Sequence, residues 1–385
     1  MRPSQQPVTE PHVSLVHDFF IQWGGAEVVI DALAQAFPNN TLYAAFDHPE
    51  IRHAPLDKAT VISSFLNKFP FSRTYMLQIY KFLLPLAFAS FRFPPETSLI
   101  ISDTASFGKF IIPPPGVMHI SFIHTPPRFL WNMPPSKKIR RNNFLRFMWN
   151  LLFGSAFRVS DYLHARTLHA LFANSQETAS RIRKFYRREP IAILNPPVYV
   201  RKFAQILADK EIEIKKEFLA FGRIAAYKNF DKLIKVWPKG YKLTIAGVGE
   251  AAEEVKRLAN LNPEVTFINR YVSDTEKPEL FASYSGFLYP NIEDFGIMMV
   301  EAIAVGTPVI SFRAGGGGEI ITHQQTGYLL EELTQEQLGK ALDWCLLQKR
   351  SKQQQEQYLG NMIKYDIESF IREIRKIANK YKKDT

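Results

Sequence analysis

The sequence predicts an α/β protein built of two parallel-sheet domains that face each other across a cleft. The chain has 385 residues, which is enough for two domains with full cores. Short apolar strands alternate with helical segments in both halves, as in parallel sheets with right-handed crossovers. Asn195-Pro196-Pro197-Val198 separates the two series. Its prolines can continue neither a helix nor a central strand, so we place a hinge there and expect domains at 1–198 and 199–385.

The first domain is expected to begin with an apolar strand that leads into a glycine turn. Val13–Val16 runs into His17-Asp18, and Gly24-Gly25 precedes a helical pattern from Val28 to Phe37. A strand, a glycine turn and a helix in this order open a parallel α/β layer. Further strands are expected at Leu99–Ser102, Met118–Ile123 and Leu171–Ala173.

The second domain is expected to repeat this alternation of strands and helices. A strand at Phe218–Phe221 leads into Gly222-Arg223 and a helix from about Asn229. The last helical pattern, at about 365–382, is amphipathic and rich in Lys and Arg, and we expect it to pack back toward the first domain. The remaining strands are expected at Leu243–Ala246, Val265–Ile268, Gly286–Tyr289 and Val309–Ser311.

The net charge of +11 lies entirely in the first half of the chain. Residues 1–205 contain 23 Lys and Arg against 12 Asp and Glu, whereas residues 206–385 contain 25 of each. Lys137–Arg158 and Arg181–Arg188 hold much of the excess, interleaved with aromatic and aliphatic residues. Such segments suit an anionic membrane surface, a lipid-pyrophosphate acceptor or nucleic acid. A solvated helix face with a buried apolar side explains them equally well.

The cellular compartment is indicated by what the sequence lacks. Cys345 is the single cysteine, which excludes an intramolecular disulfide and a thiolate zinc site and suits a reducing compartment. The longest apolar stretch, Met76–Phe93, is interrupted by charges and a proline, and the first ten residues do not form a signal peptide. We therefore expect a cytoplasmic protein with peripheral contact at the inner membrane face.

The segment Pro290–Glu319 carries the strongest functional signal. A strand ends at Pro290, Glu293 lies in the following loop, Gly296 opens a helix and Glu301 falls inside it. A helix start with free N–H groups and a flexible glycine can bind an anion, and the two carboxylates can hold hydroxyl groups. Ordinary glutamates on a surface helix are the plain alternative, against which the glycine run at residues 315–318 argues. The pattern predicts a pocket for a ligand that is part phosphate and part sugar.

Three basic side chains are placed to complete this pocket. Arg223 and Lys228 share the loop after a predicted strand, and they could hold a diphosphate opposite Gly296. His124 follows the strand at Met118–Ile123 and is stiffened by two prolines. A histidine at the carboxyl end of a strand faces the cleft, although a hydrogen-bonded structural histidine is an equal alternative.

The sequence predicts no metal and no cofactor. It contains no Asp-x-Asp, the usual carboxylate clamp for a metal-bound diphosphate, and no cluster with zinc spacing. A phosphate-binding P-loop and a nucleophile elbow are also missing. A metal-free site would neutralise a departing diphosphate with Arg, Lys and helix N–H groups, which this chain supplies.

These motifs resemble the family 4 retaining glycosyltransferases of GT-B fold, with two Rossmann-like domains. The resemblance covers about residues 13–330, and Glu293 to Glu301 in its Phe-Gly context is its most specific part. The segment HTPPRFLW, from His124 to Trp131, is similar to the corresponding segment of the family members that build bacterial surface polysaccharides, often as mannosyltransferases. The supporting motifs are His17-Asp18, Gly24-Gly25-Ala26-Glu27, His124-Thr125-Pro126, Ala173-Asn174-Ser175, Asn195-Pro196-Pro197-Val198, Gly222-Arg223 with Lys228, and Gly315 to Glu319.

The resemblance implies a role for each matching residue. Gly25 would bring its backbone N–H to the donor phosphate, and Arg223 and Lys228 would hold the diphosphate. Glu293 would bind hydroxyls of the donor sugar, and His124 would contact that sugar near the reacting carbon. Glu301 would hold the ribose. The N–H groups around Phe295, Gly296 and Ile297 would touch sugar and phosphate.

The resemblance implies a retaining hexosyltransferase that acts without a metal. Its donor would be a GDP- or UDP-sugar, with GDP-mannose expected, and its acceptor a glycan or lipid-linked glycan. A GT-B isomerase acting on a nucleotide sugar would share the donor site but needs a water-activating acid pair that we cannot place. A basic nucleic-acid-binding protein would explain the charge but not Glu293 and Glu301, and no recognised nucleic-acid motif is present.

Overall fold

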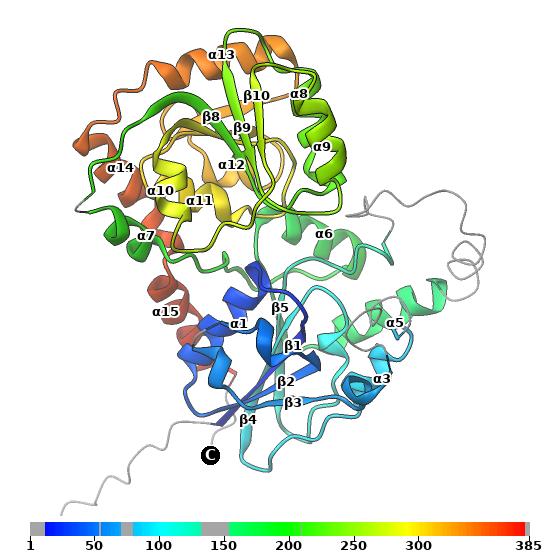
Figure 1. The fold of residues 1–385 in the computed structure, drawn as a ribbon. Helices are drawn as coiled ribbons and strands as arrows, with labels where there is room; N and C mark the ends of the chain where they lie inside the picture. Colours follow the sequence, from blue (N-terminus) through cyan, green and yellow to red (C-terminus); the bar gives the residue numbers. More distant parts are fainter. Residues whose placement is uncertain (1–11, 54, 71–79, 132–153, 209, 382–385) are drawn as a thin grey trace, which may run out of the picture.

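The computed structural model describes residues 12–53, 55–70, 80–131, 154–208 and 210–381. They form two α/β domains, each a parallel sheet with helices packed on it, stacked one above the other in Figure 1. The predicted fold class is therefore confirmed. Among the described residues, no helix is long and apolar enough to cross a membrane.

The first domain contains a seven-stranded sheet in the order β3-β2-β1-β4-β5-β6-β7. All neighbouring strands are parallel, and the central strand β4 is buried along its whole length, because helices cover both faces. The strands are β1 (His12–Phe20), β2 (Asn40–Asp47), β3 (Val61–Ser63), β4 (Thr97–Thr104), β5 (Met118–Ile123), β6 (Ala170–Ala173) and β7 (Ala192–Ile193), and the α-helices are α1 (Gly25–Ala36), α3 (Leu84–Ala89), α5 (Gly154–Thr167) and α6 (Gln176–Tyr186).

The second domain contains a six-stranded parallel sheet in the order β10-β9-β8-β11-β12-β13. The order reverses between β8 and β11, and the loops that follow these two strands carry Arg223 and Glu293. Ligands of such sheets bind at this switch point. The strands are β8 (Lys215–Phe221), β9 (Lys242–Ala246), β10 (Val265–Ile268), β11 (Tyr284–Tyr289), β12 (Val309–Phe312) and β13 (Gly327–Leu330). The helices are α7 (Val200–Leu207), α8 (Phe230–Lys235), α9 (Ala252–Ala259), α10 (Lys277–Ala282), α11 (Ile297–Ala304), α12 (Gly316–Ile320), α13 (Gln335–Leu346) and α14 (Lys352–Met362).

Two chain crossings join the domains, and they are hydrogen-bonded to each other. The N–H of Val198 donates to the carbonyl of Tyr365, and the N–H of Ile367 donates to the carbonyl of Val198. The final helix α15 (Ile367–Ala378) then lies beside α1 of the first domain, as the red and blue helices of Figure 1 show. Arg375 of α15 donates to the carbonyl oxygen of Ala36 at 2.7 Å. The last helix therefore fastens the chain back onto the first domain.

Several predicted elements differ from the structure in their bounds. The first strand continues to Phe20, so His17 and Asp18 lie within β1, and the first helix already begins at Gly25. The sequence pattern showed only the short apolar stretch of this strand. Polar side chains that find partners inside the protein can extend a strand beyond such a stretch. Strands β2, β3, β7 and β13 were not predicted.

Candidate functional site

A cavity of about 1160 Å³ lies between the two domains. Its wall includes eight of the nine predicted site residues. They come from the start of α1, the loops after β5 and β8, and the loop and helix that follow β11. These residues are Gly25, His124, Arg223, Glu293, Phe295, Gly296, Ile297 and Glu301. Lys228 is the exception, since it is buried behind the wall. The structure thus brings all nine predicted residues to one place.

Two helix N-termini meet at this cavity, one from each domain. Gly25 begins α1, and Ile297 begins α11 after Gly296, whose φ of 106° lies in the left-handed region. A Cβ added to Gly25 would lie 2.8 Å from Cδ1 of Ile297, so the absence of a side chain allows this approach. Free N–H groups at both helix starts favour an anion between them.

The loop that carries Glu293 rests on the glycine run. The N–H of Gly316 donates to the carbonyl of Glu293 at 2.9 Å. A Cβ at Gly316 would fall 1.6 Å from the carbonyl oxygen of Phe295, a distance that no side chain could occupy. Gly315 and Gly316 therefore serve close backbone packing beneath the loop, which is a structural use that the sequence alone did not reveal.

Lys228 and Glu293 form an ion pair in the wall of the cavity. Nζ of Lys228 donates to Oε1 of Glu293 and, at 2.8 Å, to the hydroxyl of Tyr289. Burial alone would lower the pKa of Lys228, but Tyr289 and Glu293 raise it above its ordinary value. Burial would raise the pKa of Glu293, but Lys228 and a hydrogen bond from Asn291 lower it. Both groups are therefore charged at neutral pH, and Lys228 orients the glutamate.

Glu301 lies in α11 with one oxygen that lacks a partner. The side chain is buried, and Oε2 makes no hydrogen bond to any of the described residues. Burial raises the pKa of this carboxyl, although Nζ of Lys277, 3.9 Å from Oε1, lowers it in part. A buried carboxylate oxygen without a donor costs stability, which makes Glu301 a candidate for binding a hydrogen-bond donor in the cavity.

Arg223 lies at the open edge of the cavity, where nearly half of its side chain is exposed. It contacts Glu250 at 3.3 Å within its own domain and Gln22 of the first domain at 3.4 Å. Both contacts are long and exposed, so little free energy holds the guanidinium in place. It can therefore turn toward an anion in the cavity.

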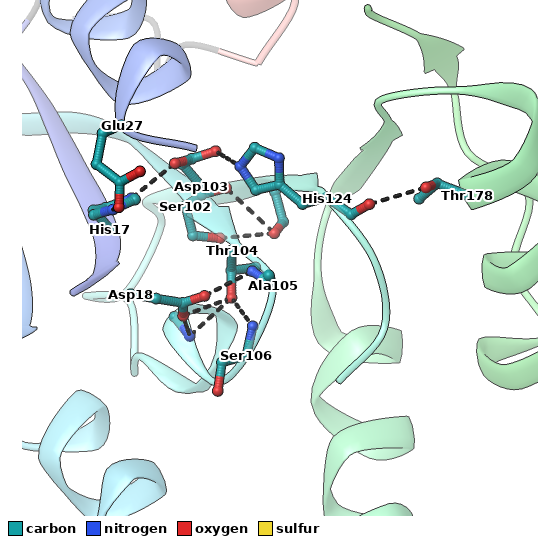
Figure 2. Close-up of polar contacts among 12 residues, drawn as sticks. His17, Asp18, Glu27, Ser102, Asp103, Thr104, Ala105, Ser106, His124 and Thr178 are labelled. Carbon is teal, nitrogen blue, oxygen red and sulfur yellow. Dashed lines mark hydrogen bonds and ion pairs between the residues drawn. The ribbon is translucent and has the colours of Figure 1, made fainter. Parts of the chain in front are cut away.

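A short hydrogen bond joins His124 to Asp103. Asp103 was not among the residues predicted from the sequence. Nε2 of His124 lies 2.6 Å from Oδ1 of Asp103, a fully buried carboxylate at the end of β4. Asp103 also binds His17 of β1, and Figure 2 shows the carboxylate between the two imidazoles. A polar residue at the carboxyl end of a buried strand was the signal that could have identified it.

Four further charged residues link the domains beside the site, and none of them was predicted in this role. Asp294 follows Glu293, and its two oxygens accept hydrogen bonds from Arg128 and Arg181 of the first domain. The carboxylate of Glu319 binds the N–H of Gln176 at the start of α6, with distances of 2.9 and 3.0 Å. Arg181 had been assigned to a basic surface segment, and the structure places it in this interdomain contact instead.

Most of the predicted basic and aromatic surface lies outside the described residues. This holds for residues 137–153, which include Phe144, Phe147, Trp149, Leu152 and Phe153. In the second basic segment, Arg183 pairs with Glu189, and Arg188 donates to the carbonyls of Ala165 and Leu168. Within the part of the chain that the structure describes, no group of three or more His, Cys, Asp or Glu side chains could hold a metal ion.

Comparison with protein families finds a match within the second domain. Residues 203–362 match the model of the family described as glycosyl transferases group 1. An uncharacterized glycosyltransferase of Haemophilus influenzae is 31% identical over 171 residues, which cover 42% of this chain and 46% of that protein. The human alpha-1,3/1,6-mannosyltransferase is 28% identical over 193 residues, covering 42% and 46%. A GDP-mannose-dependent phosphatidylinositol monomannoside mannosyltransferase of Mycobacterium tuberculosis is 27% identical over 146 residues, covering 34% and 38%. The chain thus spans less than half the length of these relatives.

Solved structures extend the similarity of fold to both domains. Anabaena HepE in complex with UDP-glucose superposes with a TM-score of 0.67 at 16% identity, covering 96% of this chain and 99% of that one. Sucrose-phosphate synthase from Thermosynechococcus elongatus gives a TM-score of 0.70 at 14% identity, covering 96% and 98%. At these identities the likeness concerns the fold, which is that of the GT-B glycosyltransferases.

Proposed function

We propose that this protein is a retaining hexosyltransferase that moves mannose from GDP-mannose to a glycan or lipid-linked glycan acceptor. The observation that carries the proposal is the shared cavity, in which two helix N-termini, an oriented glutamate and an unpartnered buried carboxylate face one space. The group 1 glycosyl transferase match of the second domain supports sugar transfer over the isomerase and nucleic-acid alternatives.

The diphosphate of the donor would lie between the two helix starts. Gly25 on one side and Phe295, Gly296 and Ile297 on the other would offer their backbone N–H groups. Arg223 would turn from its exposed contacts to bind the phosphates. Lys228 would act from behind the wall, where its charge stabilises the diphosphate through space while its Nζ holds Glu293.

The two glutamates would bind the sugar parts of the donor. Glu293, ionised and oriented by Lys228, would accept hydrogen bonds from hydroxyls of the transferred hexose. Glu301 would accept from the ribose hydroxyls, which would satisfy its Oε2. His124, on the first-domain side of the cavity, would contact the hexose near the carbon that reacts.

The choice of mannose and GDP rests on the relatives. The human and mycobacterial relatives are both mannosyltransferases, and the second is named as GDP-mannose-dependent. Anabaena HepE was solved with UDP-glucose, so UDP-glucose is the donor against which GDP-mannose must be tested. Bacterial surface polysaccharide is the acceptor class that the sequence resemblance implies.

The proposed chemistry is a same-face substitution without a metal ion. A nucleoside diphosphate leaves readily once its charge is neutralised, so the site needs cations and N–H donors at the phosphates more than a strong acid. The leaving phosphate oxygen would take the proton of the acceptor hydroxyl as the new glycosidic bond forms on the face from which the diphosphate departs. Retention of configuration would follow from this geometry.

We also propose peripheral contact of the first domain with an anionic membrane. The excess of Lys and Arg in residues 1–205 supports it, because each basic residue near such a surface contributes about 1 kcal/mol. Since Arg181, Arg183 and Arg188 have partners within the protein, the attachment would rest mainly on Lys137–Arg158.

Nucleotide binding and turnover test the proposed function together. Thermal unfolding should be measured with GDP, UDP and ADP and their hexose conjugates. At a hundredfold excess over Kd, the true donor nucleotide should stabilise the fold by about 2.7 kcal/mol. Release of nucleoside diphosphate from GDP-mannose in the presence of acceptor should survive excess EDTA.

A pair of variants provides the control for this experiment. Glu293→Ala should reduce turnover at least 100-fold, because it removes a group that meets the reacting sugar. Glu336→Ala removes an exposed glutamate that pairs with Lys340 of the same helix α13, and it should leave turnover unchanged. The proposal is wrong if no nucleotide stabilises the protein, and its metal independence is wrong if EDTA abolishes transfer and Mg²⁺ restores it.

A further inference from the structure

Asp103 connects the cavity to a line of buried ionisable groups. It lies at the end of β4, between β1 and β5, and its Cα is in register with that of His17. Its Oδ2 accepts from Nδ1 of His17 at 2.8 Å, and its Oδ1 accepts from Nε2 of His124 at 2.6 Å. Because successive side chains of a strand alternate, neighbouring parallel strands place these three side chains on one face of the sheet.

The line continues from His17 to the first turn of α1. Nε2 of His17 lies 3.6 Å from Oε1 of Glu27, which is also buried. Two residues earlier, Gly25 lines the cavity. The series Glu27, His17, Asp103 and His124 therefore runs from the first turn of α1 to His124, which lines the cavity. Figure 2 shows these four side chains.

The charges of this series are determined by mutual contact. Burial would raise the pKa of Asp103, but the two histidines lower it, so the group is a carboxylate. Burial would lower the pKa of His17, yet hydrogen bonds to Asp103 and Glu27 raise it to about 10. His17 is thus an imidazolium between Asp103 and Glu27, and one oxygen of Asp103 remains for His124.

Asp103 determines which ring nitrogen of His124 is available to a ligand. The backbone of His124 is already fixed, since its N–H donates to the carbonyl of Thr104 and its carbonyl accepts from the hydroxyl of Thr178. A carboxylate can only accept, so Nε2 must carry a proton. Nδ1 has no hydrogen-bond partner among the described residues, and the ring lines the cavity.

We propose that Asp103 is the positioning residue of this site, holding the Nε2 proton of His124 so that Nδ1 is the ring atom presented to the bound sugar or phosphate. Asp103 does not itself line the cavity and would act only through His124. His17 binds the other oxygen of this carboxylate and prevents it from turning away. A hydrogen-bonded carboxylate fixes the tautomer and the ring orientation of a histidine in the same manner in other enzyme sites.

The chain offers a matched control for a merely structural role. Asp161 of α5 is as deeply buried as Asp103. It accepts a hydrogen bond from Nε1 of Trp131, and its Oδ1 lies 2.6 Å from Nζ of Lys109. It does not line the cavity. Removing its charge therefore reports the cost of losing a buried ionic contact in the same domain, without an effect on His124.

Nitrogen-15 NMR of histidine-labelled protein tests the proposal directly, and it requires no knowledge of the donor. We expect His124, assigned by loss of its signals in His124→Gln, to carry a proton on Nε2 in the wild-type protein. In Asp103→Asn the protonation pattern of His124 should change, whereas Asp161→Asn should leave it unchanged. A neutral wild-type His124 with a bare Nε2 overturns the proposal, whatever the variants do.

Turnover gives the second readout, and this arm alone rests on the proposed function. Asp103→Asn should lower kcat at least 100-fold with less than about threefold change in the donor KM, because a misplaced acid–base or hydrogen-bonding group typically costs 10²–10⁴. Asp161→Asn should keep kcat per folded molecule within about threefold. Equal kcat values for the two variants overturn the positioning role. Absence of turnover in the wild type with the expected tautomer overturns only the proposed function.

Discussion

Glu301 illustrates at the scale of one residue how a binding group can weaken the protein that carries it. Its buried carboxylate has a single cationic neighbour, Lys277, at 3.9 Å, and its Oε2 has no donor among the described residues. Because burial raises the folded-state pKa above the ordinary value of 4.5, the folded protein holds the proton of this carboxyl more tightly than the unfolded chain does. The contribution of this group to the free energy of unfolding is thus fully present at acid pH. It is lost as the pH rises through the raised pKa.

Glu301→Gln should therefore stabilise the free protein at neutral pH, by about 1 kcal/mol, since a neutral amide is cheaper to bury than an unpartnered carboxylate. The gain in Tm over the wild type should shrink as the pH falls toward 4.5. The stabilisation by the donor nucleotide should become smaller, because an amide binds ribose hydroxyls less well. Glu336→Gln, on the exposed face of α13, is the control. A variant that is less stable than the wild type at neutral pH would contradict this account.

The sequence predicted residues whose signal is local and missed those whose meaning depends on distant partners. Glu293, Gly296 and Glu301 stand within nine positions of one another, so their strand–loop–helix context could be read directly. Asp103 became a candidate only when the fold placed it against His17 and His124, 86 and 21 positions away. No periodicity in the sequence encodes such contacts.

At the scale of elements, the site depends on how closely the backbones of two segments approach. The loop before α11 packs directly on the glycine run that begins α12. The backbone of this run therefore supports the predicted phosphate site from below. From the sequence, this run only argued that the nearby glutamates are not ordinary surface residues. Close backbone packing is a different requirement, and it explains why four glycines occur in succession at residues 315–318.

Gly316→Ala should destabilise the fold by about 3 kcal/mol, because the added Cβ would lie 1.6 Å from the carbonyl oxygen of Phe295 and the backbone must move. The loop that carries Glu293 should shift, and nucleotide stabilisation should disappear. Gly339→Ala in α13 is the matched control, since its Cβ would meet no atom within 4 Å. Alanine there should stabilise the helix by up to about 1 kcal/mol. Urea unfolding of both variants checks this, and equal midpoints would contradict the packing role.

The predicted boundaries of elements failed where tertiary contacts override local sequence. β1 extends through His17 and Asp18 because both side chains find partners at the end of β4: Asp103 for the first, and the hydroxyl of Thr104 at 2.8 Å for the second. The continuous apolar pattern ends at Val16, before the polar pair His17-Asp18, so the predicted strand was too short. The two-residue strand β7 carries too short a signal to be recognised at all.

At the scale of the whole molecule, the cavity exists only while the two domains remain closed on each other. Two hydrogen-bonded crossings near Val198 and Tyr365 connect the domains at one side. Beside the cavity, Asp294 of the second domain binds Arg128 and Arg181 of the first. The crossings can act as a hinge, and the ion pairs as the contacts that hold the closed arrangement.

Asp294→Ala should shift the protein toward an open arrangement, because it leaves two arginines without their shared carboxylate. Hydrogen bonds between charged groups contribute about 1.5–3 kcal/mol each, and loss of about 1.4 kcal/mol from the closed state would weaken donor binding about tenfold. Small-angle X-ray scattering of the free protein should show a larger radius of gyration, and saturating donor nucleotide should reverse much of the change. Glu189→Ala removes an exposed ion pair with Arg183 that lies wholly within the first domain, so it should alter neither quantity. If Asp294→Ala keeps the wild-type scattering curve and donor affinity, the closed arrangement does not depend on the ion pairs of Asp294.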